Sequence, residues 1–334
     1  MKTHPMGNTG LLLSELALGT MIFGEEGQRG TEKKDAVDLI HRYLDRGGNH
    51  IDTANVYAGG RSEEIVGEAL RGKRSQVVLA TKVRFAVGDG PNDQGLSRYH
   101  ILRSVEDSLR RLNTETIDLL YMHAWDPLTP LEESLRAFDH LVRAGKVRYI
   151  GVSNFKAWQL MKSLCLSDAH DWVRFQAAQY QYSLVEREIE AEIGDLCQVE
   201  DLSLIPWGPL GGGFLSGKYQ RGDRPASGRL AVMPEKAEEA WQRRALERNW
   251  RILDVMDDIK SSYNYSHPQI ALRWLLEQPG VDSVILGVRT AEQLEDNLGA
   301  AEIHLPEEEI SRLNEISAPQ PGYPHRFLEA YARR

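Results

Sequence analysis

Four ionisable side chains of complementary type occur within the first 123 residues: Asp52, Tyr57, Lys82 and His123. A tyrosine phenol has a pKa of about 10 and is a poor acid or base at neutral pH. An ammonium group beside it stabilises the phenolate and lowers that pKa towards the working range. Lys82 can supply this charge, and Asp52 can hold Lys82 protonated and oriented. His123 can donate a hydrogen bond to a carbonyl oxygen that also meets the hydroxyl of Tyr57.

This set predicts a site that protonates an oxygen atom as negative charge develops on it. Each residue alone has an ordinary structural role, since a strand-end aspartate is often a helix cap and a lone lysine or tyrosine is usually a surface residue. The hypothesis therefore depends on a fold that brings the four side chains together.

Short apolar runs with little alternation predict strands that are covered on both faces. They are residues 16–19, 50–52, 77–82, 117–123, 147–152, 175–179, 202–207 and 283–287. Segments of helical period lie between them, at residues 33–46, 63–70, 100–112, 131–144, 157–166, 189–199 and 291–300, with two more before the last strand.

Strand and helix alternate eight times, which predicts a parallel sheet with crossover helices, and eight units are the number that closes a barrel. We therefore expect an α/β protein, a (β/α)8 TIM barrel, with residues 1–334 as a single domain. Asp52, Lys82 and His123 end the second, third and fourth strands, and Tyr57 lies in the loop after the second. In such a barrel the carboxyl ends of the strands meet at one mouth, where chemistry takes place.

Two segments lie outside this alternation. Asn8-Thr9-Gly10 between short apolar stretches predicts an N-terminal hairpin that caps the bottom of the barrel. Residues 208–243, after the seventh strand, are rich in Gly, Pro and Arg and have no strong period. A long loop of this kind is typical of a lid or a binding loop.

The chain has 334 residues and a net charge of −9, with no long basic run. This argues against nucleic acid or an anionic membrane as a partner. There is no signal-peptide pattern and no run of about 18 apolar residues, so we expect a cytoplasmic protein. The two cysteines lack metal-ligand spacing, and no convincing set of His and carboxylate ligands supports a metal-dependent hydrolase. The sequence does not indicate an oligomeric state.

Several motifs occur in an order that resembles the aldo-keto reductase superfamily from about residue 11 to residue 305. They are Gly19-Thr20-Met21, Asp52-Thr53-Ala54 with Tyr57, Gly60-Arg61-Ser62-Glu63, Ala80-Thr81-Lys82 and Gly151-Val152-Ser153-Asn154. Trp207-Gly208-Pro209-Leu210 is closest in style to the bacterial and potassium-channel β-subunit-like branches.

The resemblance implies a reduction in which hydride from nicotinamide C4 reaches a carbonyl carbon while Tyr57 protonates the oxygen. Lys82 and Asp52 would tune Tyr57, His123 would orient the carbonyl, and no metal would be required. The resemblance also assigns cofactor contacts to Thr20, Asp52, Ser153, Asn154, Gln179, Trp207, Pro209, Leu210 and Gly287.

Among these, Ser153, Asn154 and Gln179 would bond the nicotinamide carboxamide, and Trp207 would stack on the ring. Each of these residues also fits a purely structural role. Ser153-Asn154 suits the cap of the next helix, Gln179 a group that satisfies the backbone, and Trp207 plain core.

A glycine-rich segment from Gly211 to Lys218 nearly spells a P-loop, but Tyr219 stands where a P-loop has a small hydroxyl residue. We interpret it as a loop folding over a dinucleotide pyrophosphate, with close backbone approach at Gly212 and a charge from Lys218. A Rossmann G-x-G-x-x-G fingerprint is absent after the first strand.

Gly287-Val288-Arg289-Thr290 opens the last of these helices and places amides and a guanidinium where an anion can bind. By resemblance, Arg289 would face the 2′-phosphate of NADPH, with Gln293 and Asn297 around the adenine, which makes NADPH a better expectation than NADH. A capping box with Thr290 also accounts for Gln293.

Phe23, Phe85 and Trp125 are the candidate walls of a pocket for a small carbonyl substrate, together with Tyr57 and Trp207. Aromatic walls suit many aldehydes and ketones and do not identify one. The alternative function is a redox-sensing regulatory subunit that binds NADPH and turns over slowly.

Overall fold

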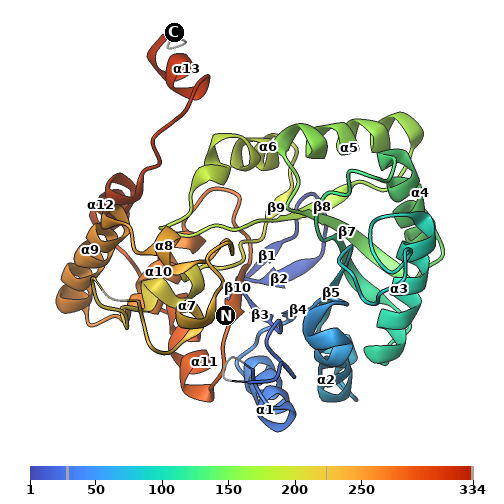
Figure 1. Ribbon diagram of the computed structural model, residues 1–334, viewed down its shortest axis with the longest axis horizontal. Coiled ribbons are helices and arrows are strands. Elements are labelled where there is room, and N and C mark those ends of the chain that lie inside the picture. Colours follow the sequence, from blue (N-terminus) through green and yellow to red (C-terminus); the bar gives the residue numbers. More distant parts are fainter. Residues whose placement is uncertain (28–29, 223, 332–334) are drawn as a thin grey trace.

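A computed structural model describes residues 1–27, 30–222 and 224–331 and contains one barrel of parallel strands (Figure 1). The sheet order is β10-β3-β4-β5-β6-β7-β8-β9, with every adjacent pair parallel. The amide of Leu204 donates to the carbonyl of Gly280 at 2.9 Å, and that of Ile285 to Pro206 at 2.9 Å, so the last two strands also meet. The predicted (β/α)8 barrel is confirmed. Its strands are β3 (Leu16–Gly19), β4 (His50–Asp52), β5 (Val78–Val83), β6 (Ile117–Met122), β7 (Val147–Ser153), β8 (Phe175–Gln179), β9 (Ser203–Leu204) and β10 (Val284–Gly287).

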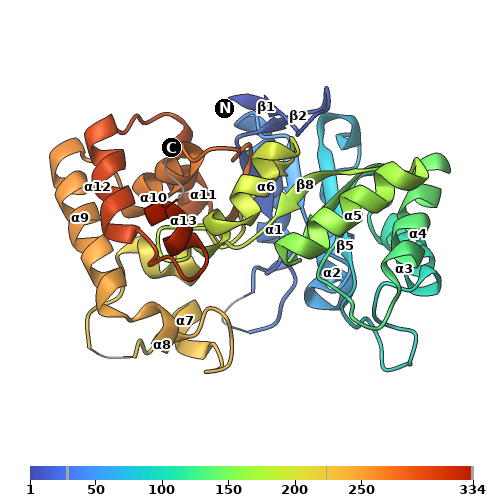
Figure 2. The same cartoon turned by 90° about the horizontal axis from the view of Figure 1, so that it is seen from above.

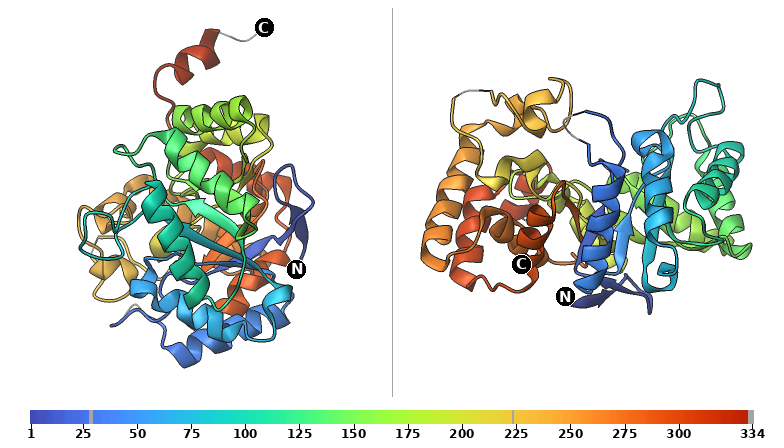
Figure 3. Two further views of the ribbon diagram at one scale, coloured as in Figure 1. Left: turned by 90° about the vertical axis from the view of Figure 1, so that its right-hand side faces the viewer. Right: turned by 90° about the horizontal axis from the view of Figure 1, so that it is seen from below.

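Amphipathic helices surround the strands (Figures 1 and 3). In α4, Leu131, Leu135 and Phe138 are buried at helical spacing, so the stripe they form faces the sheet. No helix in the described ranges is both long and apolar enough to cross a membrane. The longer helices are α1 (Lys33–Asp45), α2 (Arg61–Ala69), α3 (Arg98–Arg111), α4 (Leu131–Arg143), α5 (Ala157–His170), α6 (Ile193–Val199), α9 (Glu247–Tyr263), α10 (His267–Leu276), α11 (Ala291–Leu298), α12 (Glu307–Ser317) and α13 (His325–Tyr331).

Two hydrophobic clusters lie on the two faces of the barrel strands, because alternate side chains of a strand point to opposite faces. On β5, Leu79 belongs to the outer cluster under the helices, whereas Val78 and Ala80 belong to the inner cluster that fills the barrel. Tyr121 also fills the interior, and a Cβ atom on Gly151 would come within 2.4 Å of its ring. A glycine at this position therefore makes room for the ring.

The N-terminal hairpin pairs β1 (Thr3–Pro5) with β2 (Leu12–Ser14) in antiparallel register, as predicted. Met6 and Leu13 are fully buried in the inner cluster, and the amide of Gly7 donates to the hydroxyl of Ser203 at 2.7 Å. The hairpin therefore closes the floor of the barrel. Figures 2 and 3 place it at the end opposite α7 and α8.

The segment after the seventh strand differs from the predicted irregular loop. It contains η4 (Gly211–Ser216), α7 (Arg229–Val232) and α8 (Trp241–Arg244), and β9 is shorter than residues 202–207. Positive φ angles at Gly212 (71°) and Gly213 (91°) interrupt the helical turns of η4. A segment interrupted in this way has no regular spacing of apolar residues, so the sequence did not indicate it. The ring of Phe214 lies 4.8 Å from that of Trp250 in α9, and the segment is thereby packed on the barrel.

His50 lies inside the barrel, fully buried, with Nδ1 2.9 Å from the Ser283 hydroxyl. Burial lowers its pKa from 6.5 to about 4. The unfolded chain therefore binds more protons between these values, and His50 costs stability as pH falls through this window. From about pH 7 to about pH 5 the loss is about 2 kcal/mol.

Urea unfolding of the wild type and of His50→Gln at these two pH values tests this expectation. The variant should lose less free energy of unfolding on acidification than the wild type, whereas His140→Gln at an exposed position should behave as the wild type does. An unchanged pH dependence in His50→Gln would show that other groups cause the loss.

Candidate active site

The four residues singled out from the sequence meet at the carboxyl ends of β4, β5 and β6. The Lys82 ammonium is fully buried and donates to three oxygens: an Asp52 carboxylate oxygen, the Thr53 carbonyl at 2.8 Å and the Tyr57 hydroxyl at 3.2 Å. An ammonium has three N–H donors, so each has an acceptor. The lysine is thereby fixed in position beneath the phenol.

Opposing effects determine the pKa of Lys82. Burial alone would lower the pKa of Lys82, but Asp52 and Tyr57 outweigh it and the pKa is raised. The lysine is therefore a permanent cation at neutral pH, as predicted.

The phenol behaves differently from the prediction. Burial raises the pKa of Tyr57, and the opposing effect of Lys82 does not overcome it. The charge of Lys82 predicts a lowered pKa, but the extent of burial at Tyr57 outweighs it, and no local sequence pattern encodes that burial. In this structure the hydroxyl is therefore a stably protonated donor.

His123 stands directly after β6 and is 9% exposed. Its ring lies edge-on to that of Tyr57, with centroids 5.9 Å apart, and to that of Phe85, 4.7 Å apart. Burial, followed by the charges of Lys82 and Arg84, lowers the pKa of His123 far below its usual value. The imidazole is therefore neutral and retains one N–H donor.

Ser153, Asn154 and Gln179 lie beside these residues and hold them in place. The Gln179 side-chain amide donates to the second Asp52 oxygen at 2.9 Å, and the Ser153 hydroxyl donates to the Gln179 carbonyl at 2.7 Å. The Asn154 amide donates to the His123 carbonyl at 2.9 Å. Neither Ser153 nor Asn154 caps the next helix, since α5 is capped at Lys156.

Thr20 and Phe23 both follow β3, and the fold gives each side chain partners of its own. The Thr20 hydroxyl is buried, donates to the Asp52 carbonyl at 3.1 Å and lies 2.8 Å from the Ser62 hydroxyl, so it links the end of β4 to the start of α2. The ring of Phe23 is 0% exposed in the outer hydrophobic cluster. The reason is a tight turn from Thr20 and a bridge to Thr31, which direct the ring inward. Assigning Phe23 to the pocket wall is therefore wrong for this structure.

The other two candidate wall residues lie near the mouth. Phe85 is 37% exposed beside His123. Trp125 is partly buried and packs edge-on against Phe155, with centroids 5.1 Å apart. An aromatic surface thus borders the four polar residues.

Trp207 follows β9 and is partly buried against the inner cluster, and its amide donates to the Tyr180 carbonyl at 2.9 Å. Pro209 is buried, Leu210 is partly buried, and Gly212 is buried inside η4. The residues assigned to the cofactor after the seventh strand are therefore close together in the fold.

Two positively charged side chains, Lys218 after η4 and Arg289 after β10, lie near each other. Burial and then the charge of Arg289 lower the pKa of Lys218, so these two cations lie within electrostatic range of each other. Gly287 and Arg289 are exposed at the end of β10. Two like charges held close together each make the charged form of the other less stable. An anion bound between them would relieve this repulsion.

The start of α11 uses Gln293 locally. The Thr290 hydroxyl accepts from the Gln293 amide at 3.2 Å, and the Gln293 side chain accepts from the Arg289 amide at 2.9 Å. The helix cap is present, although Gln293 bonds one residue before the position that a capping box requires. Asn297 is 3% exposed in the same helix.

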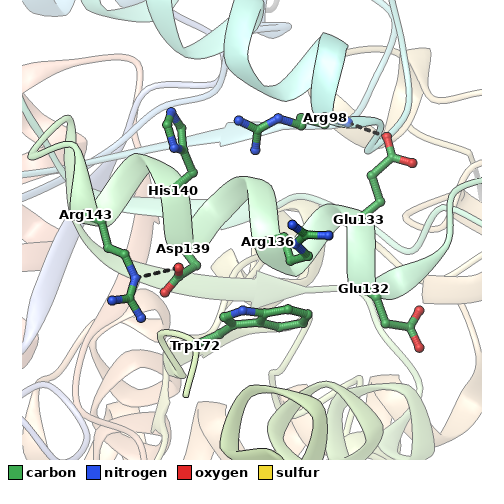
Figure 4. Close-up of a pocket in the computed structure, with 8 residues that line it drawn as sticks. All are labelled: Arg98, Glu132, Glu133, Arg136, Asp139, His140, Arg143 and Trp172. Atoms are coloured by element: carbon green, nitrogen blue, oxygen red, sulfur yellow. Dashed lines mark hydrogen bonds and ion pairs between the residues drawn. The ribbon is translucent and has the colours of Figure 1, made fainter. Parts of the chain in front are cut away.

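A surface cavity of about 720 Å³ lies elsewhere, on the outer side of α4 (Figure 4). Its lining comes from α4, the start of α3 and the turn after α5, and includes Arg98, Arg136 and Trp172. None of the four residues at the strand ends lines it. We therefore assign the chemistry to the barrel mouth and not to this cavity.

Sequence reasoning missed several groups near the mouth. Arg84 and Phe85 contact each other, with the guanidinium carbon 5.3 Å from the ring centre. Arg229 of α7 forms an ion pair with the buried Glu239, and its charge partly opposes the rise that burial causes in the pKa of Tyr57. Arg84 follows the third strand directly, which was a usable signal, whereas no local pattern placed Arg229 near Tyr57. In the described ranges no three His, Cys, Asp or Glu residues form a group that could hold a metal ion.

Comparison with known proteins agrees with this geometry. The family model described as "Aldo/keto reductase family" matches residues 15–318. The chain is 38% identical to "Uncharacterized oxidoreductase YrpG" of Bacillus subtilis, with 98% of each chain covered.

Two further relatives are named for different functions. "Probable voltage-gated potassium channel subunit beta" of Oryza sativa is 35% identical, with 91% of this chain and 92% of the relative covered. "Norsolorinic acid reductase stcV" of Emericella nidulans is 36% identical, with 96% of this chain and 82% of the relative covered. The match across most of its length shows that the chain belongs to the aldo/keto reductase family of oxidoreductases.

Proposed function

We propose that this protein is an NADPH-dependent reductase of aldehydes and ketones in which Tyr57 is the general acid. The observation that carries the proposal is the Lys82 ammonium, which bonds Asp52, the Thr53 carbonyl and the Tyr57 hydroxyl at the barrel mouth. When bound, the reduced nicotinamide supplies the hydride that the carbonyl carbon accepts, and the oxygen takes a proton, so that an alcohol is formed.

The residues around the mouth fit a dinucleotide. Ser153, Asn154 and Gln179 present amides and a hydroxyl beside Asp52, which would hold the nicotinamide end. Lys218, after η4, and Arg289, after β10, lie within electrostatic range of each other. Two such cations suit phosphate groups. Trp207 supplies a flat, partly buried ring directly after the seventh strand of the barrel, against the inner cluster, on which the nicotinamide would stack.

In the proton transfer, Tyr57 donates its hydroxyl proton as charge develops on the carbonyl oxygen. Lys82 lies 3.2 Å from the phenol oxygen and would stabilise the phenolate that remains. Asp52 keeps Lys82 charged, and neutral His123 can donate a second hydrogen bond to the same substrate oxygen. General acid catalysis of this kind contributes about 10²- to 10⁴-fold in rate.

The decisive experiment follows the absorbance of NADPH in the presence of 4-nitrobenzaldehyde or methylglyoxal, with and without a metal chelator. Loss of the reduced cofactor at equal rates in both conditions is the expected result. Activity that depends on metal would point to a different barrel chemistry.

A regulatory subunit that binds NADPH is the second candidate, because two relatives are described as probable voltage-gated potassium channel β subunits. Tight NADPH binding, seen as quenched nicotinamide fluorescence, with no turnover across a panel of aldehydes would favour it. Turnover favours the reductase.

Replacing Arg289 with Ala should raise the dissociation constant of NADPH by about 10- to 100-fold, because a charged contact to phosphate contributes about 1.5–3 kcal/mol. The dissociation constant of NADH should change much less. Fluorescence titration with both reduced cofactors measures the difference, and equal weakening of the two would refute the 2′-phosphate contact.

A further inference from the structure

Arg84 carries a positive charge at the rim of the proposed proton-transfer site. It is the first residue after β5, which also provides Lys82. Its guanidinium carbon lies 5.3 Å from the centre of the Phe85 ring, and the same ring lies 4.7 Å from that of His123. The guanidinium and the imidazole thus contact one shared aromatic ring. Arg84 is therefore within reach of a molecule whose carbonyl group meets His123.

No carboxylate of the described chain lies within ion-pair distance of Arg84, and its Nε is buried without a hydrogen-bond partner there. Asp126 lies within electrostatic range, but its carboxylate accepts from the Leu96 amide at 2.7 Å, the Leu128 amide at 3.0 Å and the Thr129 hydroxyl at 2.7 Å. Arg84 is thus a charge that the fold brings to the mouth without neutralising it.

Two cations that act on Tyr57, Lys82 and Arg229, differ from Arg84 in this respect. Lys82 is neutralised by Asp52, and Arg229 by Glu239. Leaving a partly buried guanidinium without a counter-ion has an energetic cost. A cost of this kind at a mouth is offset when a ligand brings the missing charge.

We propose that Arg84 binds a carboxylate of the substrate, so that this site takes aldehydes or ketones that also carry a carboxylate group. The inference rests on the proposed reductase function and narrows its substrate class. A guanidinium matches the planar carboxylate with two parallel hydrogen bonds. A phosphate monoester carries about −1.5 to −2 charges, which one guanidinium does not balance. The rings of Phe85 and Trp125 would contact the apolar part between the two groups.

The test compares 4-carboxybenzaldehyde with its methyl ester, which has nearly the same shape and no charge. The value of kcat/KM is measured for both with saturating NADPH, in the wild type, Arg84→Gln, Arg84→Lys and Arg136→Gln. Arg136 lines the outer cavity of Figure 4 and gives the same change of charge far from the mouth.

The wild type is expected to prefer the acid to the ester. In Arg84→Gln the ratio of acid to ester should fall by about 10- to 100-fold, mainly through KM, which corresponds to one lost hydrogen-bonded charge pair. Arg84→Lys should recover part of the ratio, and Arg136→Gln should keep the wild-type ratio.

Three results would overturn the inference alone, and a fourth would overturn it together with the reductase function. Equal turnover of acid and ester by the wild type would remove it while leaving the reductase function in place. Equal losses for both substrates in Arg84→Gln would make Arg84 a positioning residue for His123. A stronger preference for glyceraldehyde 3-phosphate would replace the carboxylate by a phosphate. If neither these aldehydes nor 4-nitrobenzaldehyde is reduced, the reductase function fails and the inference fails with it.

Discussion

Tyr57→Phe is expected to lower kcat for aldehyde reduction by about 10²- to 10⁴-fold, the contribution of a well-placed general acid. The change removes one oxygen atom and leaves the ring that packs against His123. The dissociation constant of NADPH should therefore stay nearly unchanged. Stopped-flow or steady-state loss of NADPH gives kcat, and fluorescence titration gives the dissociation constant.

A matched control is Tyr263→Phe, which removes the same atom from the outer surface of α9, where the side chain is 38% exposed. It should retain the wild-type kcat. A Tyr57→Phe enzyme with most of its rate would show that another group donates the proton.

The pH dependence of kcat for reduction follows from the direction in which the pKa of Tyr57 is shifted. Because burial raises the pKa of Tyr57, the phenol stays protonated below that value, and reduction should not slow through neutral pH from loss of this proton. A fall in kcat centred near neutral pH would instead indicate the lowered pKa that the sequence suggested.

Lys82→Met is expected to abolish most activity and also to destabilise the fold by about 3–5 kcal/mol, since breaking a buried ion pair leaves an uncompensated charge. The side chain of Lys82 is 0% exposed and that of Asp52 is 4% exposed. After the substitution, Asp52 keeps only Gln179 as a side-chain donor among those described. The urea midpoint and the slope of the unfolding curve measure the loss.

The double variant Asp52→Asn with Lys82→Met separates charge from shape. It removes the orphaned carboxylate and should recover part of the free energy of unfolding while activity stays low. A Lys82→Met protein as stable as the wild type would mean that Asp52 is neutral or solvated in the folded chain.

Much of the barrel was readable from the chain because its strands are short apolar runs separated by amphipathic helices. Helix boundaries agree with the predicted ranges within a few residues for α1, α3 and α4. The segment after β9 was not readable, because its helices are single turns held by contacts such as Phe214 with Trp250, which are distant in sequence.

Phe23 illustrates why the sequence did not place every site residue. It follows β3 closely, as a mouth residue should, yet the turn from Thr20 to Phe23 rotates its ring into the core. Side-chain direction in a loop depends on backbone angles that no periodicity reports. The same holds for Arg84, whose neighbour His123 comes from another strand.

The sequence by itself determined that Asp52, Tyr57, Lys82 and His123 belong to one mouth, because the carboxyl ends of parallel barrel strands converge whatever their loops do. Only the tertiary structure decided their electrostatic state. Burial is a sum over distant elements, and here it raises the pKa of Tyr57 and keeps His123 neutral. The tertiary structure also decided that Gln179 holds Asp52 across the barrel, since a hydrogen bond between β8 and β4 depends on distances that a linear pattern does not contain.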